Sequence, residues 1–411
     1  LTNANGNVVF DSAKSVIVNG NIVAGGAGSD ITITSSTAST GTFDFLAGSI
    51  SASDAVSITF RTTFNAAALT TISGNSVVVA GIDGTNAAQT YSFAGRVFSG
   101  TTIAVNAGQN NNASILDISG RMSAGTSIDL FTNARGATTP SGPSDQIGLT
   151  GVVTAGTTLS IGQATNVTST IVSISGTATG NSGVTITGAA AGATVVSVSG
   201  SLVANGGTIS LLGGTANPAS STYSISGAIS NTGGGVSITG PTTGSGTTAI
   251  SVSGAIAAAT TIAVTAGTGV GYTGSGIFAV SGSLNAGTTI TLGAGAATVA
   301  GTVSVAVSGS LTAGTSTTVQ GADAIDFLQV TGRVTGAATF NGEASDDQFS
   351  LAPQTGSAFT VNGGAGTDTL QILTSVSNIT SSSGSPITFL ASSGFQNWTA
   401  TSIENRNPLI P

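Results

Sequence analysis

The sequence predicts an all-β protein, a single-stranded, right-handed parallel β-helix (a solenoid) of about 13 coils with roughly 27 residues each. Three observations lead to this prediction. A glycine recurs at a nearly constant interval, apolar residues alternate with polar ones around each of these glycines, and the segments between repeats vary freely in length. Variable segments of this kind are typical of external loops.

The recurring glycines mark one point of the repeat, and we call them the corner glycines. From Gly176 onward they lie 23 to 28 residues apart, a period typical of solenoids. We expect glycine here because a tight corner requires positive φ, which glycine adopts at little cost. The set is Gly20, Gly48, Gly95, Gly120, Gly151, Gly176, Gly200, Gly227, Gly254, Gly282, Gly309 and Gly332, with a weaker member at Gly74.

The apolar residues around each corner glycine sit at even offsets, which predicts strands. In the stretch from Val280 to Leu292, Leu284 follows Gly282 by two positions, and a second strand carries Ile290 and Leu292. A single coil cannot bury its apolar side chains alone, so coils must stack. The main alternative is a row of immunoglobulin-like sandwiches, which need about 100 residues per unit and do not suit this short period.

The composition of the chain argues against several classes of function. Charged residues are 5% of the chain, with 7 Lys and Arg against 15 Asp and Glu, and there is no His or Cys. We therefore expect no nucleic acid partner and no disulfides. The longest apolar run, around 255–264, is too short to cross a bilayer, so we expect no membrane insertion. Because the chain starts at Leu1 with no leader, we expect that a signal peptide has been removed.

Catalysis is not expected. The commonest general base and the thiol nucleophile are absent. The outward column of the second strand, which runs from Thr32 through Thr291 to Thr318, contains one acid, Asp129, whereas glycoside hydrolysis needs two facing carboxylates. The same column mixes Thr with Ser, Ala and Asp, so no unbroken threonine array is expected. A polysaccharide lyase or hydrolase and an ice-binding protein are thus the less favoured alternatives.

A candidate calcium site lies near the end of the chain. Six of the fifteen acids fall between Asp323 and Asp368, and the segment GGAGTDTLQ (363–371) matches the pattern G-G-x-G-x-D-x-U-x. We predict calcium ligands from two segments, with Asp347 supplied by the related NGEASDDQF segment. The predicted residues are Asp347, Gly363, Gly364, Gly366 and Asp368. The alternative is a tight turn with an exposed aspartate.

The repeated phrase V-S-G-S-L-x-A-G-T-T-I resembles the passenger β-helices of large bacterial exoproteins and adhesins, of the autotransporter or two-partner-secretion kind. The segments GEASDDQF, VNGGAGTDTL and SIENRN resemble those of RTX-type surface proteins. The resemblance divides the chain into a β-helix body (1–335) and RTX-like terminal coils with a C-terminal cap or linker (336–411). It implies a secreted protein at the cell surface, with structural or adhesive work.

Two functions stay open. The first is a noncatalytic rod or filament subunit that assembles with itself, laterally or head to tail, through the start near Asn7 and the tail near Ile403. The second is an adhesin passenger that binds host or polysaccharide surfaces, such as cell-surface glycans. Arg96 and Arg121 follow corner glycines in consecutive coils, near Asp117, and form either a small anion or sugar-acid site or a weak surface ion pair. Trp398 is expected to close the last coil.

Overall fold

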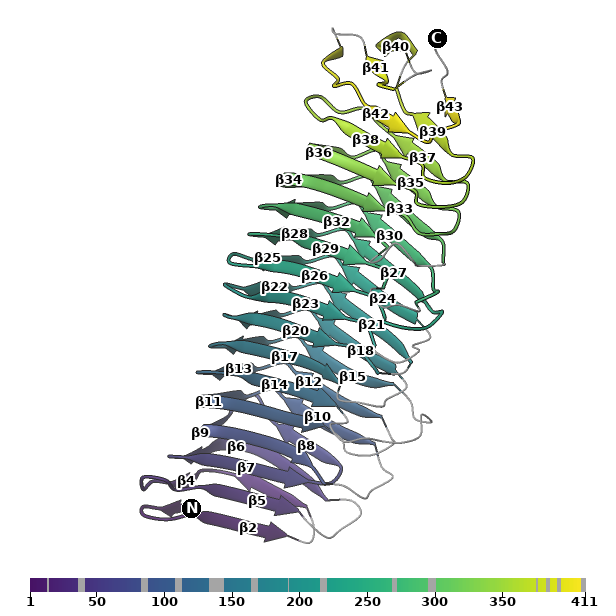
Figure 1. Cartoon of the computed structure of the whole chain (residues 1–411). Coiled ribbons are helices and arrows are strands. Elements are labelled where there is room, and N and C mark those ends of the chain that lie inside the picture. The colour runs from purple at the N-terminus through teal and green to yellow at the C-terminus, as the bar shows by residue number, and fades with distance from the viewer. Residues whose placement is uncertain are drawn as a thin grey trace. The chain divides into compact units, whose positions relative to one another are not determined.

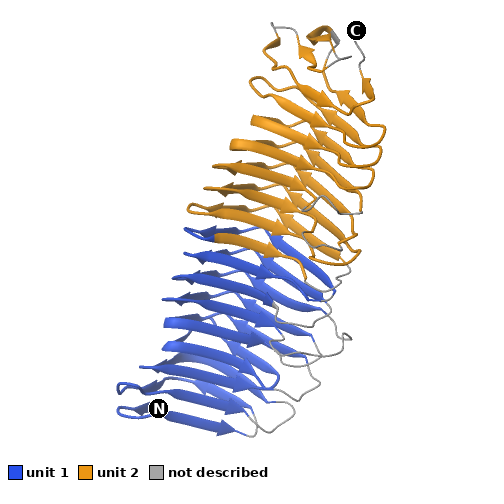
Figure 2. Cartoon of the chain, viewed as in Figure 1, with its two compact units in different colours: residues 1–207 blue, residues 208–411 orange. Residues whose placement is uncertain are grey.

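The fold is an all-β parallel solenoid of about 13 coils, with 66% strand and 1% helix (Figure 1). The computed structural model describes residues 1–12, 15–35, 41–82, 88–107, 113–132, 144–163, 169–190, 192–214, 220–267, 272–294, 301–374, 376–381, 385–389 and 393–407. The predicted fold class is confirmed. The chain divides into two compact units, 1–207 and 208–411 (Figure 2), and each is described by itself. The boundary expected between 335 and 336 stays a prediction.

Each full coil carries three strand positions, and a strand at one position pairs in parallel with the strands at that position in the neighbouring coils. In unit 1 the first position holds β3 (Val16–Asn19), β8 (Thr63–Ala66), β10 (Gln89–Phe93), β12 (Ser114–Ile118), β15 (Asp145–Leu149), β18 (Ser169–Ile174) and β21 (Ala193–Val198). The second holds β1 (Thr2–Asn3), β4 (Ile22–Ala24), β13 (Arg121–Ala124), β16 (Val152–Ala155), β19 (Thr177–Gly180) and β22 (Ser201–Ala204). The third holds β2 (Val8–Ser12), β5 (Ile31–Ser35), β7 (Ala55–Phe60), β14 (Ile128–Thr132), β17 (Thr158–Gln163) and β20 (Gly183–Thr187). Three longer strands each span two positions: β6 (Thr42–Ala52), β9 (Thr70–Gly81) and β11 (Arg96–Ala107).

Unit 2 repeats this plan. Its first position holds β24 (Ser220–Ile225), β27 (Thr247–Val252), β30 (Gly276–Val280), β33 (Val303–Val307), β35 (Phe327–Val330), β37 (Gln348–Leu351), β39 (Thr369–Ile372) and β43 (Asn405–Asn407). The second holds β25 (Ala228–Asn231), β28 (Ala255–Ala258) and β31 (Ser283–Ala286), and the third holds β23 (Thr208–Leu212), β26 (Gly235–Thr239), β29 (Ile262–Thr265), β32 (Thr289–Gly293), β38 (Phe359–Asn362) and β42 (Thr399–Thr401). β34 (Ser310–Gln320) and β36 (Arg333–Asn341) span the second and third positions. A short 3-10 helix (Val376–Asn378) and the antiparallel pair β40 (Ile379–Ser381) and β41 (Thr388–Phe389) complete the unit.

The core consists of apolar columns, because in-register pairing places equivalent side chains directly over one another. Ile128 on β14 pairs with Ile103 below and Leu159 above, and all three side chains are buried. The predicted even-offset residues behave the same way in unit 2, where Leu284 pairs with Ile256 and Leu311. The predicted alternation is thus confirmed for these strands.

The reason for the corner glycines differs from the prediction. Only Gly20 and Gly48 have positive φ, whereas most corner glycines lie too close to the preceding coil to carry a side chain. A Cβ on Gly120 would lie 1.9 Å from the carbonyl oxygen of Gly95. Close approach of stacked backbones therefore excludes every other residue. Gly74 is not part of this column, because it pairs with Ser99 rather than with Gly95.

Aromatic side chains stack inside both units. In unit 1 the rings of Phe43 and Phe64 are stacked with centroids 5.3 Å apart. In unit 2 the fully buried Trp398 stacks on Phe359 at 4.8 Å and meets the edge of Phe389 at 5.2 Å. Trp398 therefore packs over the last coils as predicted. Across the described residues, no helix has the length and apolar character needed to cross a membrane.

Candidate functional site: the aspartate turns

Four successive coils of unit 2 are joined by three similar turns, which we call the aspartate turns. They comprise residues 321–326, 342–347 and 363–368, and each runs from a glycine to an aspartate. Each turn carries the chain from the third strand position of one coil to the first position of the next, for example from β36 to β37. The turns therefore recur every 21 residues at one edge of the unit (Figure 1).

The second and third aspartate turns follow the same backbone path. Ala344 and Ala365 form a parallel bridge, and the Ala365 N–H donates to the Glu343 carbonyl at 2.9 Å. Glu343 has φ 81° where the third turn has Gly364 at 97°. Because glutamate in this region is uncommon, its presence indicates that the turn geometry is imposed by the stack. The weak glycine content of the second turn thus does not prevent it from adopting the shape of the third.

The aspartates that end these turns form a continuous ladder of hydrogen bonds. The Asp326 N–H donates to Asp347 Oδ1 at 2.9 Å, and the Asp347 N–H donates to Asp368 Oδ1 at 2.8 Å. The Asp368 N–H in turn donates to Glu404 Oε2 at 2.8 Å. We call Asp326, Asp347 and Asp368 the aspartate ladder. Each carboxylate satisfies a backbone N–H of the preceding coil at the point where the next strand begins.

All three side chains of the aspartate ladder are buried, which corrects the alternative of an exposed aspartate at this turn. Burial raises the pKa of Asp326 to about 7 and that of Asp347 to about 7, because a desolvated carboxylate is disfavoured. For Asp347 the charges of Asp326 and Asp368 add to this effect. Burial also raises the pKa of Asp368, and Glu404 contributes. The ladder is therefore a line of buried acids that are costly to ionise.

Two oxygen atoms of the ladder have no partner. Asp347 Oδ2 and Asp368 Oδ2 are buried without a hydrogen bond, and buried acceptors left unpaired cost free energy. Each lies over the first glycine of its own turn: a Cβ on Gly363 would be 2.2 Å from Asp368 Oδ2. Unpaired carboxylate oxygens beside backbone carbonyls are the donor chemistry that a hard cation takes.

The predicted calcium ligands are thus brought together in part. Asp347 and Asp368 occupy paired positions in adjacent coils, and Gly363, Gly364 and Gly366 belong to the turn that Asp368 ends. Within the described ranges, however, no three His, Cys, Asp or Glu side chains are arranged to hold a metal ion. The donor types fit calcium, and the occupancy of the turns stays a prediction.

The sequence analysis missed Asp326 as a member of the ladder. Its turn has the sequence GADAID and lacks the paired glycines that drew attention to the third turn. A different signal could have found it, because Asp145, Asp326, Asp347 and Asp368 each stand directly before an alternating strand with apolar residues at the second and fourth following positions. Asp145 acts in the same way in unit 1, where its Oδ1 accepts the Ser114 N–H at 2.7 Å.

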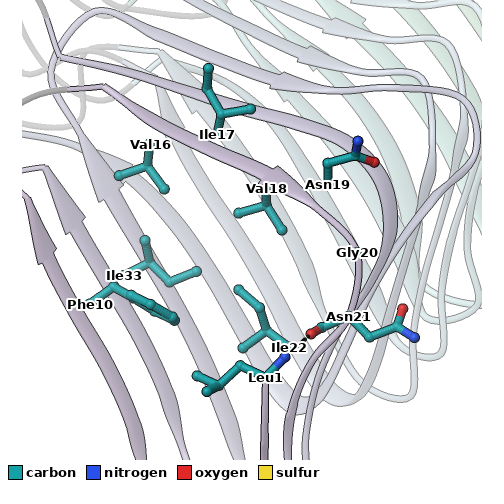
Figure 3. Close-up of a pocket in the computed structure, with 10 residues that line it drawn as sticks. All are labelled: Leu1, Phe10, Val16, Ile17, Val18, Asn19, Gly20, Asn21, Ile22 and Ile33. Atoms are coloured by element: carbon teal, nitrogen blue, oxygen red, sulfur yellow. Dashed lines mark hydrogen bonds between the residues drawn. The ribbon is translucent and has the colours of Figure 1, made fainter.

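A second candidate region lies on the first coils of unit 1. Leu1, Val9 and Ile17 are 68%, 68% and 66% exposed, and Phe10 is partly exposed beside them. Figure 3 shows the apolar groove that these coils form, a cavity of about 280 Å³. Its lining includes Leu1, Phe10, Val16, Ile17, Val18, Ile22 and Ile33, together with the polar corner Asn19, Gly20 and Asn21. We call it the first-coil groove.

The outward threonines also differ from expectation. The column predicted through Thr291 and Thr318 continues in register through Thr339, Thr360 and Thr399, so five consecutive threonines do form an unbroken array in unit 2. The sequence analysis ended its column at Thr318 and missed the rest. The neighbouring outward column holds Gly293, Gln320, Asn341 and Asn362 before Thr401, so along this array the two columns both carry threonine at 399–401 alone.

No family model, no curated protein and no solved structure matches this chain. The function is therefore inferred from the fold and from the chemistry of the described residues.

Proposed function

We propose that the protein is a noncatalytic structural element, a β-helical rod or filament subunit that works outside the cell. The observation that supports this proposal is the in-register parallel pairing of each unit, combined with an exterior in which few side chains are charged. Such a surface packs against a second copy with little electrostatic repulsion. A secreted, cell-surface location suits a chain without cysteine and with few protease-sensitive cations.

The first-coil groove is the surface we propose for self-assembly. Its exposed apolar side chains, Leu1, Val9 and Ile17, are the kind of surface that marks a protein–protein contact, and a second copy would cover them. The partner surface on the second copy is the edge of β42 and β43. These strands are short and expose Thr399, Thr401, Asn405 and Asn407, whereas Ile403 is buried. The tail would therefore contribute backbone hydrogen bonds, and the groove would contribute apolar area.

Electron microscopy of the purified chain tests self-assembly. Filaments or oligomers are expected for the wild-type chain and should be lost on Ile17→Asp, which places a charge in the first-coil groove. Ile115→Asp is the matched control, because Ile115 is similarly apolar and 39% exposed but lies on β12, away from the groove. Dispersed monomers of the wild-type chain at high concentration would contradict the assembly.

We also propose that the aspartate turns bind calcium and thereby stiffen the terminal coils. The unpaired oxygens of Asp347 and Asp368 support this proposal. The ion would supply positive charge to a line of buried acids, and Asp347, Asp368 and the carbonyl groups of Gly363, Gly364 and Gly366 would hold it. Calcium is in this case a structural component, and no chemical step depends on it.

The second candidate function is adhesion to polysaccharide or host surfaces as a domain of a longer chain. It is favoured by one observation, the pair of arginines, Arg96 and Arg121, on the outer surface of unit 1. Binding to an array of glycans by monomeric protein would distinguish adhesion from the structural role.

A further inference from the structure

Two arginines lie directly opposite each other on the outer surface of unit 1. Arg96 on β11 pairs in register with Arg121 on β13, and both side chains are exposed. Like charges at directly opposed positions destabilise a sheet. The repulsion between them therefore costs free energy unless another group offsets it. The pairing is also unusual for this chain, which has only 7 Lys and Arg residues.

No carboxylate of the protein does so in the part of the chain that the structure describes. Neither arginine forms an ion pair there, and Asp117, which the sequence placed nearby, lies on β12 at the first strand position, where it pairs with Ser92 and Gly148. The ion pair considered from the sequence is therefore not formed. Both guanidinium groups keep their donors available to a ligand.

Apolar and hydroxyl groups lie beside Arg96, one member of the arginine pair. A cavity of about 240 Å³ is lined by Ala68, Leu69, Thr70, Thr71 and Arg96, and Leu69 is 85% exposed. Phe98 is two residues beyond Arg96 on the same strand, so it points to the same side, and it is half-buried. We call Leu69, Thr71, Arg96, Phe98 and Arg121 the arginine patch.

We propose that the arginine patch binds an acidic oligosaccharide, with sugar carboxylates held by Arg96 and Arg121 and a ring face against Phe98 or Leu69. Guanidinium groups bind carboxylates in a planar, bidentate manner. The two arginines are one rung apart, about 4.8 Å, which is on the order of the length of one sugar ring. An anionic ligand that bridges the two arginines relieves their mutual repulsion, and this relief contributes to the free energy of binding.

Charge favours a short acidic ligand over a long polyanion. The whole chain has a net charge of −8, which repels a polyanion such as a nucleic acid that would extend beyond the patch. A uronic acid chain has a single carboxylate on each ring and an apolar ring face between them. This spacing matches a small basic patch with an aromatic side chain beside it. The proposal rests on the second candidate function, adhesion to polysaccharide, and is independent of the structural role proposed above.

Calorimetric titration with a short oligogalacturonate tests the proposal, with the methyl-esterified, uncharged oligosaccharide as the comparison ligand. The acidic ligand should bind and the ester should not. Arg96→Gln and Arg121→Gln should each weaken binding about tenfold or more, as expected for loss of a charge-assisted hydrogen bond, and added salt should weaken it further. The double variant should show no binding.

Arg333→Gln is the matched control. Arg333 also follows a corner glycine and begins the strand β36, but it pairs with Ser310 instead of a second arginine. The Arg333→Gln variant removes the same charge from the chain and should leave the affinity for the acidic oligosaccharide unchanged. Equal weakening by this variant, equal binding of the ester, or no binding of the acidic ligand would each overturn the proposal.

Two further measurements separate other sources of binding. Inorganic phosphate or vesicles containing phosphatidylserine that bind as tightly as the acidic ligand would overturn the assignment to a saccharide.

The melting temperature shows whether the glutamine variants are folded. Because they remove the repulsion between the two arginines, their melting temperature should be unchanged or slightly higher. If either glutamine variant melts at a lower temperature, the lysine variants Arg96→Lys and Arg121→Lys serve as the test, because they keep the charge but lack the planar guanidinium group. An affinity between that of the wild type and that of the glutamine variants supports the arginine patch. An affinity equal to that of the wild type contradicts bidentate binding.

Discussion

Replacing the corner glycine Gly200 with alanine should destabilise its coil strongly. The new Cβ would lie 2.1 Å from the carbonyl oxygen of Gly176, 2.4 Å from that of Ser175 and 2.5 Å from the Ser175 carbonyl carbon. Because atoms of this kind pack at about 3.5 Å, the two coils must separate locally by more than about 1 Å. The contacts are with backbone atoms, so no side-chain rotation relieves them.

The cost follows from what the separation breaks. Three hydrogen bonds hold this corner: the N–H groups of Ser199 and Gly200 donate to the Ile174 carbonyl, at 2.9 and 3.0 Å, and the Ser201 N–H donates to Gly176 at 2.9 Å. Weakening them costs about 1 kcal/mol each, and the steric strain adds about 1–3 kcal/mol. We expect the free energy of unfolding to fall by about 4–6 kcal/mol.

Urea denaturation of the full chain followed by circular dichroism measures this loss, and hydrogen exchange of peptides spanning 195–205 shows where it occurs. Stacked coils need not unfold in one step, so the local exchange is the more direct assay. Gly206→Ala is the control, because in the same coil its nearest atom would be 3.5 Å from the new Cβ and its φ is not positive. A Gly200 variant as stable as the Gly206 variant would refute close approach as the reason for the corner glycines.

The other predictions concern unit 2. The pKa values of Asp326 and Asp347 lie near 7 in the fold against an ordinary 3.8, so between about pH 4 and pH 7 the folded chain keeps protons that the unfolded chain releases. The free energy of unfolding should therefore fall as pH rises through this range without calcium, and Asp347→Asn should flatten the dependence seen in denaturation curves at several pH values; a stability that rises over this range would contradict the buried acids. Millimolar calcium at pH 7.5 should raise the melting temperature of the wild-type chain, and Asp368→Asn should abolish the increase. Asp54→Asn, which lies outside the aspartate turns, is the control and should keep the increase. An equal increase for the two variants would exclude the aspartate turns as the calcium site. Trp398→Ala should cost about 3–5 kcal/mol in chemical denaturation, because it removes a fully buried ring that contacts Phe359 and Phe389; a loss below about 1 kcal/mol would show that the tail does not cover the last coils.

The strands and their stacking could be predicted from the sequence because the information is local and repeated. Residues such as Leu284 and Ile290 keep their offsets from Gly282, and alternation over a few residues is enough to assign the inward side. The reason for Gly282 itself could not be predicted. A glycine that turns the chain and a glycine that approaches another backbone look alike in a sequence, and only the position of the Gly254 carbonyl distinguishes them.

The aspartate turns show the same limit. Gly363 and Asp368 were recognised because their segment matches a known sequence pattern. Asp326 belongs to a turn with a different sequence, although it forms the same hydrogen bond to the next coil. Whether an aspartate is buried depends on the coil stacked above it, which lies 21 residues further along the chain. The relation of Arg96 to Arg121 could be predicted because both follow a corner glycine, but the absence of their ion pair depends on the direction of Asp117.

The corner-glycine column has a consequence for how such a chain changes length. In six coils the corner glycine lies against the carbonyl group of the corner glycine before it and places its own carbonyl group against the one after it, so the two faces of these coils are interchangeable at this corner. These glycines are Gly120, Gly151, Gly176, Gly254, Gly282 and Gly309. A segment cut from one corner glycine to the next could be duplicated or deleted, and the join would bring together surfaces that already fit. Growth and loss by whole coils is then tolerated, while an insertion at the corner itself is not.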